Sequence, residues 1–417
     1  MIRASKMAAA SVSAPPGQPD ITYTPDFDKY KARTQRRLAT EKLENTLPPG
    51  FPEKLESEFV WDGDSIKESG YNWVYELSVE EVAEIEAALE HFKSLNLSQG
   101  HISPTTFPLP TLHAPLRTLS HLLHHGPGFA VLRGLPVATH TRTDNFTLYA
   151  GVSSHIAPIR GRQDQTHNGA PADVVLAHIK DLSTTADAAH IGAPAYTTDK
   201  QVFHTDAGDV IALLCLSAAA EGGTSRVASN WRVYNELART RPDLVRTLAG
   251  EWVQDGFGRP DRPYTSRPLL YHQPATTTDP ERIIIQYARR SFTGFQALPR
   301  TPTIPPITEA QAEALDAVHF LAERFALGLD FQPGDVQYIN NLATFHARDG
   351  FRDSEEQQRH LVRLWLRDPE YAWETPEPLK SRWDELYKGV TPDKQVFPLE
   401  PKIRSASSGV AAKTVSG

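Results

Sequence analysis

The middle of the chain, from Gly128 onward, consists of short apolar segments of uneven length that are separated by long connections. Short runs rich in β-branched and aromatic residues are typical of strands, and the clearest span residues 129–132, 174–179, 210–216 and 283–287. They do not alternate with helices, and no glycine-rich fingerprint follows them, which disfavours a dinucleotide-binding fold. The pattern predicts a mainly β chain with flanking helices (α+β), built around a jelly-roll core.

Two amphipathic helices are predicted, and each begins with a capping box. Ser78 and Glu81 open the first helix, and Thr308 and Gln311 open the second. Gly328 can end the second helix. Apolar residues follow each cap at helical spacing, namely Val82, Ile85, Leu89 and Phe92 in the first helix and Leu315, Val318, Leu321, Ala322 and Phe325 in the second.

The segment after the second helix is expected to form a hairpin. Residues 329–331 and 336–339 are strand-like, and Gln332-Pro333-Gly334-Asp335 between them has the composition of a tight turn. A further strand is predicted over residues 359–366.

Changes in composition divide the chain into four predicted parts. Residues 1–60 are rich in proline and charge and are expected to form a partly disordered N-terminal arm with local helix. Residues 61–104 are expected to be a helical extension packed on the core, and residues 105–390 to be the main domain. Residues 391–417 contain the Ser-, Ala-, Gly- and Lys-rich end of the chain and are predicted to be a disordered tail.

The N-terminus is interpreted as a disordered leader, with a mitochondrial transit peptide as the alternative. It carries Arg3 and Lys6, is rich in Ala and Ser, and has no acidic residue before Asp20. Its arginine content is low for a transit peptide, so we expect a cytoplasmic protein.

Charge and cysteine content exclude several classes of function. The net charge is −8 and Lys and Arg do not form runs, so nucleic acid is not the expected partner. The longest apolar stretch, Val210–Ala220, is too short to span a bilayer, so no membrane partner is expected. Cys215 is the only cysteine, which excludes an intrachain disulfide, and its apolar strand predicts an inert core residue. A metal site must therefore use histidine and carboxylate.

The sequence contains one His-x-Asp tripeptide, His204-Thr205-Asp206. With 16 histidines, about one such tripeptide is expected by chance, so alone it is weak evidence, and each residue could be a surface or capping residue. On a strand, alternation would place His204 and Asp206 on the same face, as two ligands of one metal require.

A third potential ligand, His346, follows much later, within Asn340-Asn341-Leu342-Ala343-Thr344-Phe345-His346-Ala347-Arg348. Two imidazoles and one carboxylate form a facial triad that leaves three positions open on iron(II). The keto oxygen and near carboxylate of 2-oxoglutarate would take two of them, and dioxygen the third. The far carboxylate then needs an arginine, which Arg359 or Arg363 can supply, and a hydroxyl donor such as Thr224.

These motifs together resemble the taurine dioxygenase (TauD/TfdA) family, and most closely its fungal members. The matching strings are His-Thr-Asp, Glu-Gly-Gly-Thr, Pro-Gly-Asp with Asn-Asn and His-Ala-Arg, and Arg-His-Leu-x-Arg-Leu-Trp-Leu, within about residues 105–390. The resemblance implies a double-stranded β-helix with iron(II) between its sheets, and 2-oxoglutarate and O2 as co-substrates. It implies that His204, Asp206 and His346 bind iron. It also assigns the far carboxylate of 2-oxoglutarate to Thr224 and Arg359, and the near carboxylate or an acidic substrate to Arg363.

Other residues have a functional and a structural interpretation. Tyr287, Arg289 and Arg290 could line a substrate pocket or be an exposed strand end. A polar loop could cap the iron site or be merely solvated; its residues are His155, Arg160, Arg162, His167 and Asn168. Two further groups are expected to be structural, at a helix end near Gly126 and in the core: His121, His124 and His125, and Trp231, Tyr234 and Leu237.

The sequence favours oxidation of an unactivated C–H bond by hydroxylation, desaturation or ring closure. A halogenase is disfavoured because that variant lacks the carboxylate ligand, whereas Asp206 is present. A zinc hydrolase would leave Arg359 and Thr224 unexplained, and a jelly-roll binding or sensor protein would not need the complete triad. No substrate pocket matches that of taurine dioxygenase; an anionic or zwitterionic small molecule is expected. The sequence leaves open whether the chain forms a homo-oligomer.

Overall fold

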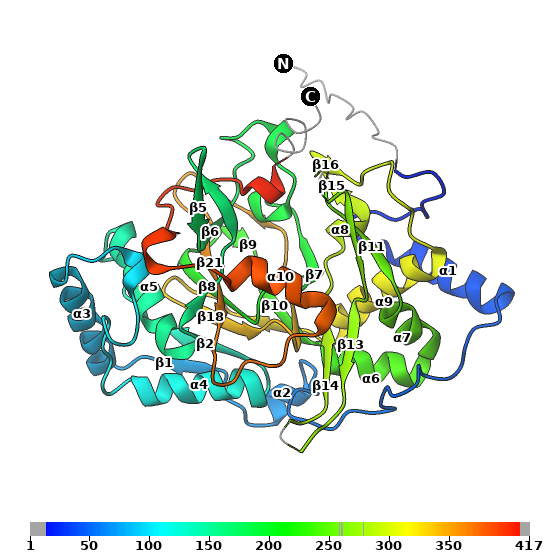
Figure 1. Ribbon diagram of the computed structural model, residues 1–417, viewed down its shortest axis with the longest axis horizontal. Coiled ribbons are helices and arrows are strands. Elements are labelled where there is room, and N and C mark those ends of the chain that lie inside the picture. The colour runs from blue at the N-terminus through cyan, green and yellow to red at the C-terminus, as the bar shows by residue number, and fades with distance from the viewer. Residues whose placement is uncertain (1–13, 258, 260–261, 278, 409–417) are drawn as a thin grey trace.

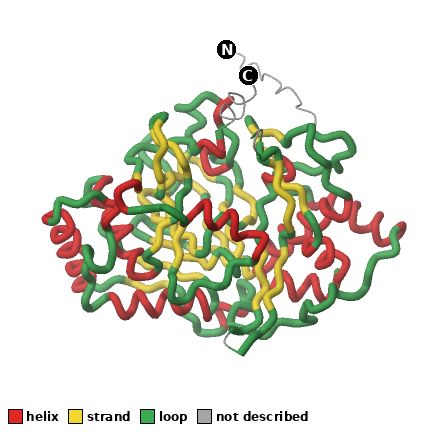
Figure 2. The backbone as a smooth tube through the Cα atoms, viewed as in Figure 1, coloured by secondary structure: helices red, strands yellow, loops and turns green. Residues whose placement is uncertain are grey.

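Two sheets form the centre of the molecule. The computed structural model describes residues 14–257, 259, 262–277 and 279–408. One sheet has seven strands: β1 (Val74–Glu76), β2 (Phe129–Arg133), β18 (Val336–Asn340), β8 (Val210–Ser217), β21 (His360–Arg367), β3 (Ile159–Arg160) and β6 (Leu176–Lys180). The other has four: β17 (Leu327–Leu329), β10 (Ser225–Ser229), β19 (Thr344–Arg348) and β7 (Gln201–His204). Figures 1 and 2 show these strands in the middle of the molecule and helices around them.

The two sheets pack face to face through one apolar layer. Ile211 and Ile339 from the seven-stranded sheet meet Val227 and Leu327 from the four-stranded sheet in one buried cluster. Strand β8 shows the alternation that this requires, since Ile211 points inward while Ala212 points to the outer face. The predicted mainly β chain with flanking helices is confirmed.

Helices cover the outer face of the seven-stranded sheet. They are α3 (Val79–Ser94), α4 (His113–His125) and α5 (Arg142–Ile156), and they share a second buried cluster with that face. Both predicted capping boxes are present, at the start of α3 and of α9 (Glu309–Phe325). Gly328 does not end α9, because the helix stops at Phe325 and Gly328 lies within β17.

A separate lobe, residues 230–326, is inserted between the neighbouring strands β10 and β17. Its ends lie close together because Val227 pairs with Leu327. Its elements are α6 (Asn230–Thr240), α7 (Pro242–Ala249), β11 (Trp252–Asp255), β12 (Tyr264–Arg267), β13 (Leu270–Gln273), β14 (Arg282–Ile285), α8 (Arg290–Thr293), β15 (Gly294–Phe295), β16 (Leu298–Pro299) and α9. Trp231, Tyr234 and Leu237 are buried in the core of this lobe, as predicted.

The hairpin predicted after α9 is wrong. Strand β17 belongs to the four-stranded sheet and β18 to the seven-stranded sheet, so the turn at residues 332–335 carries the chain between sheets. Gly334 has φ +90°, and a Cβ atom there would lie 2.4 Å from the carbonyl oxygen of Leu135. Glycine is therefore required both for the backbone conformation and for the close approach.

The strand predicted over residues 174–179 is interrupted at Val175, because Val175 donates its N–H to the carbonyl oxygen of Val396 in the C-terminal segment. The result is two strands, β5 (Ala170–Val174) and β6. The remaining elements are α2 (Ser65–Glu68), β4 (Asp164–His167), β9 (Glu221–Gly222), β20 (Phe351–Arg352), α10 (Glu377–Tyr387), β22 (Gln395–Val396) and the 3-10 turns η1 (Gln99–His101), η2 (Ala188–His190), η3 (Pro194–Tyr196), η4 (Pro392–Lys394) and η5 (Ser405–Ser407).

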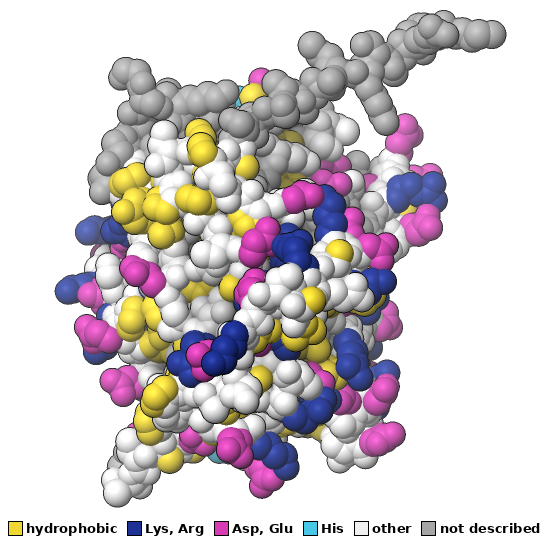
Figure 3. All heavy atoms as spheres, turned by 90° about the vertical axis from the view of Figure 1, so that its right-hand side faces the viewer, with side chains coloured by type: hydrophobic (Ala, Val, Ile, Leu, Met, Phe, Trp, Pro, Cys, Tyr) yellow, Lys and Arg dark blue, Asp and Glu magenta, His cyan; other side chains and the backbone are white. Residues whose placement is uncertain are grey.

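The N-terminal arm is anchored to the lobe through α1 (Phe27–Thr40). Arg33 on α1 lies 2.6 Å from Asp316 on α9, and both side chains are buried. Arg36 pairs with Glu309 at the surface, 2.7 Å away. Figure 3 turns this side toward the viewer, and positive and negative side chains are interspersed over the described part of the face. Residues 14–60 are thus an ordered arm, while residues 1–13 lie outside the described part.

The predicted disordered tail is wrong for residues 391–408. Strand β22 pairs in parallel with β5, and Ser408 forms a bridge with Ile191. Residues 409–417 lie outside the described residues. Within the described part of the chain, no helix is long and apolar enough to cross a bilayer.

Candidate metal and co-substrate site

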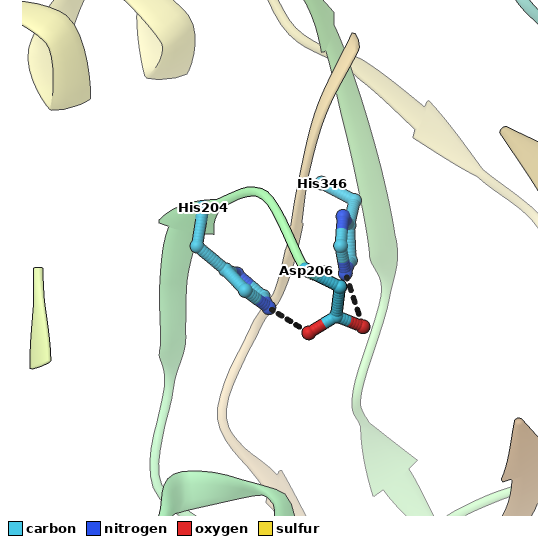
Figure 4. A group of neighbouring side chains, drawn as sticks. All are labelled: His204, Asp206 and His346. Atoms are coloured by element: carbon cyan, nitrogen blue, oxygen red, sulfur yellow. Dashed lines mark ion pairs between the residues drawn. The ribbon is translucent and has the colours of Figure 1, made fainter. Parts of the chain in front are cut away.

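His204, Asp206 and His346 converge between the two sheets (Figure 4). His204 is the last residue of β7, and His346 lies opposite it in register on β19. Asp206 does not lie on a strand: it follows β7 in a turn. The expected strand alternation is therefore wrong, and the turn, not a pleat, points the carboxylate toward the two imidazoles.

The three side chains are close enough to share one ion. Nε2 of His204 lies 4.0 Å from Oδ1 of Asp206, and Nε2 of His346 lies 3.9 Å from Oδ2. One potential ligand atom from each residue lies within 4.8 Å of the others.

Both imidazoles are held in a form that can bind a metal. Nδ1 of His204 lies 2.9 Å from the carbonyl oxygen of Val202, which can only accept, so Nε2 carries the lone pair. Burial lowers the pKa of His204 and lowers that of His346 to about 3, so both rings are neutral. Burial alone would raise the pKa of Asp206, but Arg363 and the two imidazoles hold it well below its usual range. Two neutral imidazoles and one carboxylate are a donor set that suits iron(II).

Asn341 fixes the turn that carries Asp206. Its Oδ1 accepts from the N–H of Asp206, and its Nδ2 donates to the carbonyl oxygens of Asp206 and Gly208, each at 2.8 Å. The lobe also holds this turn, since Thr205 donates its N–H to the carbonyl oxygen of Tyr287 at 2.7 Å. Asn341, the second residue of the Asn-Asn motif, therefore positions the metal-binding turn.

Three side chains orient Asp206 and its neighbourhood. Arg363 donates to Oδ2 of Asp206 at 2.7 Å, and the indole of Trp365 donates to the same oxygen at 3.3 Å. Gln163 accepts from Nε of Arg363 at 2.9 Å. Trp365 and Gln163 were missed as site residues in the sequence, although Trp365 lies two residues beyond Arg363 and so shares its face on β21.

A pocket beside the triad is lined by three arginines: Arg348, Arg359 and Arg363. Each has a buried N–H group without a hydrogen-bond partner among the described residues, on Nε, Nη1 and Nη2 respectively. Burial lowers the pKa of Arg359 to about 9 and that of Arg363 to about 10. The unsatisfied donors make this pocket suitable for an anion.

Thr224 does not line this pocket, whereas Ser225 does. Thr224 is exposed and faces a neighbouring cavity of about 340 Å³, which Arg359 and Cys215 also line. Ser225 begins β10 and is buried, with its hydroxyl donating to Gln337 at 2.6 Å. Thr224 precedes β10 and Ser225 is its first residue, so the two neighbouring hydroxyls face two adjacent cavities, both of which Arg359 lines.

The glycine before Thr224 makes room for Arg359. Gly223 has φ +76°, and a Cβ atom there would lie 3.1 Å from Nε and 3.2 Å from Cδ of Arg359. The Gly-Gly motif therefore serves the arginine as well as the turn.

Residues 287, 289 and 290 have three different roles. Tyr287 is buried, and its backbone bonds to Thr205. Arg289 pairs with Asp316 at 2.7 Å and donates to Thr22, so it joins the lobe to the N-terminal arm. Arg290 donates to the carbonyl oxygen of Gly192 at 2.8 Å, next to the C-terminal segment.

The five residues singled out between His155 and Asn168 bond to other parts of the chain, although Gln163 in the same segment contacts Arg363. His155 bonds to His113 and Phe107 within the helical layer, and Arg160 donates to the carbonyl oxygens of Gly100 and Ile102. Arg162 pairs with Asp173, while His167 and Asn168 lie at the turn between β4 and β5.

The histidines at residues 121, 124 and 125 and the cysteine are structural, as predicted. The three histidines lie in the last turns of α4, which ends at Gly126, and pack around Tyr371. Cys215 is buried, and burial raises the pKa of its thiol to about 12.

Comparison with known proteins agrees with this geometry. The profile of the taurine catabolism dioxygenase TauD, TfdA family matches residues 92–365. The taurine hydroxylase-like protein SAT17 of Stachybotrys chartarum is 36% identical over 357 residues, covering 84% of this chain and 89% of that protein. The FR-33289 synthase of Streptomyces rubellomurinus is 27% identical over 317 residues, covering 74% and 88%.

Solved structures share the fold. An asparagine oxygenase in complex with Fe(II), 3-hydroxyasparagine and succinate superposes with a TM-score of 0.52 at 16% identity, covering 78% of this chain and 100% of that one. The non-haem iron oxygenase OrfP with iron and α-ketoglutaric acid gives 0.50 at 15% identity, covering 70% and 93%. The predicted jelly-roll core is confirmed. The chain belongs to the TauD/TfdA family and is an iron(II)- and 2-oxoglutarate-dependent dioxygenase.

Proposed function

We propose that this dioxygenase oxidises a C–H bond of a small anionic or zwitterionic molecule of the amino-acid type. The observation that carries the proposal is the set of unpartnered, buried guanidinium N–H groups of Arg348, Arg359 and Arg363 beside the triad. Arg363 pairs with Asp206, but Arg348 and Arg359 form no ion pair with a described residue, and burying such cations without an anion is costly. One 2-oxoglutarate dianion and the acidic group of a substrate would supply the missing partners.

His204, Asp206 and His346 would bind iron(II) through two Nε2 atoms and a carboxylate. Arg359 would hold the far carboxylate of 2-oxoglutarate through paired N–H donors. Ser225 is the proposed hydroxyl partner, because it lines the pocket beside the triad together with Arg359, whereas Thr224 lines the neighbouring cavity.

Arg363 would act at two places. Its Nη1 orients Asp206, and its unpartnered Nη2 is available to the near carboxylate of 2-oxoglutarate or to the substrate. Iron(II) and 2-oxoglutarate supply the oxidising chemistry, with succinate and CO2 as products. The residues of the chain orient the target bond and exclude water, for which the packed sheets around the site are suited.

The comparisons support an amino-acid substrate only by analogy. The asparagine oxygenase was crystallised with a hydroxylated amino acid. The fungal relative is a taurine hydroxylase-like protein, and taurine is another small zwitterion. Whether the outcome is hydroxylation, desaturation or ring closure depends on the substrate.

The proposal is tested by iron- and 2-oxoglutarate-dependent succinate release across a panel of amino acids and organic acids. His204→Ala, Asp206→Ala and His346→Ala should each abolish iron binding and turnover while the circular dichroism spectrum stays native. Full activity of any of these variants at substoichiometric iron would remove that residue from the ligand set.

Metal substitution separates the competing classes. A zinc hydrolase would be active with zinc and independent of 2-oxoglutarate, and a binding or sensor protein would bind ligand without releasing succinate. Asp206→Gly should lose oxygenation. At high chloride concentration this variant should show traces of halide transfer, because chloride could take the position on iron that the carboxylate leaves open.

A further inference from the structure

The C-terminal segment, residues 391–408, brings Arg404 over the iron site. Ser405 bonds to Asp164 through its N–H and its hydroxyl, each at 2.6 Å. Ser407 accepts from the N–H of Gly192 at 2.9 Å. The N–H of Arg404 itself donates to the hydroxyl of Tyr196 at 3.1 Å. The backbone on both sides of Arg404 is therefore fixed, and Figure 1 shows this red end of the chain crossing the upper part of the molecule.

The side chain of Arg404 packs on Trp365, which contacts the expected metal ligand Asp206. Its guanidinium carbon is 5.3 Å from the centre of the Trp365 ring, and that of Arg363 is 4.9 Å from the same ring. The indole N–H of Trp365 donates to Asp206. Trp365 thus connects Arg404 to the carboxylate that would bind iron.

A second arginine, Arg290 of the lobe, contacts the C-terminal segment next to Arg404. Arg290 donates to Gly192 at 2.8 Å and to Ala406 at 3.5 Å, so it touches the segment that carries Arg404. Burial and the positive charge of Arg404 together lower the pKa of Arg290 to about 10.

Neither arginine has an acidic partner among the described residues. No carboxylate there lies within 4.0 Å of Arg404 or Arg290. By contrast, Arg33, Arg37 and Arg241 each pair with a carboxylate. Nε of Arg404 is buried and makes no hydrogen bond with any described residue. Two neighbouring cations that form no ion pair with a described residue repel each other, so an anion between them would be stabilised.

We propose that Arg404 and Arg290 bind the anionic head group of the substrate, a carboxylate, sulfonate or phosphonate, at the mouth of the iron site. The C-terminal segment is then a wall of the substrate site and sets specificity together with the lobe. This inference rests on the proposed function, because it assumes that the substrate is oxidised beside Asp206.

The position of Arg404 would also let the substrate and 2-oxoglutarate bind beside the triad at the same time. Arg359 and Ser225 line the pocket proposed for 2-oxoglutarate. Arg404 is not among the residues that line that pocket and lies over Trp365. The two anions would therefore occupy different places around one metal. A substrate held by its head group at Arg404 would leave its carbon chain free to extend toward the iron.

The test compares Arg404→Gln, Arg290→Gln and a matched control, Lys402→Gln, which removes a charge from the same segment. Lys402 is exposed and lies 3.5 Å from Asn168, away from the triad. The probes are β-alanine, taurine and 2-aminoethylphosphonate, which differ only in the anionic group, and ethylamine, which has none. Their binding to the full chain, loaded anaerobically with iron(II) and 2-oxoglutarate, is measured by calorimetry.

At least one anionic probe should bind, and ethylamine should not. Arg404→Gln and Arg290→Gln should weaken that binding about tenfold to a hundredfold, as expected for the loss of a charged hydrogen bond, and Lys402→Gln should leave it unchanged. Arg404→Lys should recover part of the loss. The probe that binds most tightly to the wild type identifies the head group.

A second measurement detects the bound anion through protection of the C-terminal segment from protease. Bound anion should slow tryptic cleavage after Arg404 in the wild type and in Lys402→Gln, but not in Arg290→Gln. The inference is overturned if no anionic probe binds to the wild type, or if Arg404→Gln binds the best probe as tightly as Lys402→Gln does. If the wild type releases no succinate with iron and 2-oxoglutarate, the proposed function itself fails; succinate release with unchanged probe affinities removes only the role of Arg404 and Arg290.

Discussion

Asn341→Ala tests how the metal-binding turn is held in place. The Asn341 side chain is fully buried and makes three hydrogen bonds with the backbone of residues 206 and 208, each at 2.8 Å. Alanine leaves one N–H group and two carbonyl groups of that turn without these partners.

The expected loss of stability follows from those bonds. A buried hydrogen bond contributes about 0.5–1.5 kcal/mol, so three of them give a loss of about 2–4 kcal/mol in the free energy of unfolding. Because Asp206 then loses its fixed direction, iron(II) affinity should fall by about tenfold to a hundredfold, as for other side chains that orient metal ligands.

Asn340→Ala is the matched control. Asn340 is equally buried, but its amide donates to the carbonyl oxygen of Leu123, and its oxygen accepts from the N–H of Leu342, both at 3.0 Å. It should lose stability in urea denaturation without a comparable loss of iron(II) affinity in anaerobic calorimetry. Equal iron affinities in the two variants would refute the positioning role of Asn341.

Three further predictions concern the co-substrate pocket and pH. Arg359→Lys should raise the KM for 2-oxoglutarate by about tenfold to a hundredfold, because lysine keeps the charge but not the paired donors; Arg363→Lys should mainly impair substrate use, and the reverse pattern would exchange their roles. Ser225→Ala should raise the same KM by about threefold to tenfold, whereas Thr224→Ala should not, and equal effects would contradict the pocket assignment. Burial also keeps four histidines outside the iron site neutral, with the pKa lowered to about 4 or about 3: His124, His178, His319 and His360. Since the unfolded chain protonates near pH of about 6.5, stability should be complete above that pH and decrease as the pH falls toward about 4. A denaturation midpoint that does not change between these pH values would disprove this dependence.

The triad could be predicted from sequence because its chemistry is explicit. A chain with a single cysteine has to build a metal site from histidine and carboxylate, and His204, Asp206 and His346 were the set with the expected order. The reason given for their convergence was nevertheless wrong, since Asp206 lies in a turn. That turn is held by Asn341 and by residue 287, which are far away in sequence and leave no local signal.

Three errors have a common physical cause. The turn at Gly334 has the composition of a hairpin, but whether its strands pair with each other is decided by the sheets around them. Thr224 and Ser225 are adjacent hydroxyls, and only the start of β10 decides which one faces the pocket. The segment after Pro401 has a disordered composition, yet Asp164 and Tyr196 order it through contacts that composition does not encode.

The insertion point of the lobe has a consequence for how such a chain can diversify. Residues 230–326 leave and re-enter the four-stranded sheet next to the paired residues Val227 and Leu327. The two ends of this insertion therefore lie side by side, whatever its internal structure. The lobe supports the metal-binding turn through the backbone of residue 287, which bonds to Thr205, and through the side chain of Gln286, which donates to the carbonyl oxygen of Asn341 at 3.5 Å. Strands β7, β10 and β19 pair with one another outside the insert, so replacing the lobe would not change their register. A chimera that carries a foreign lobe should therefore still bind iron, and its substrate range should follow the donor of the lobe.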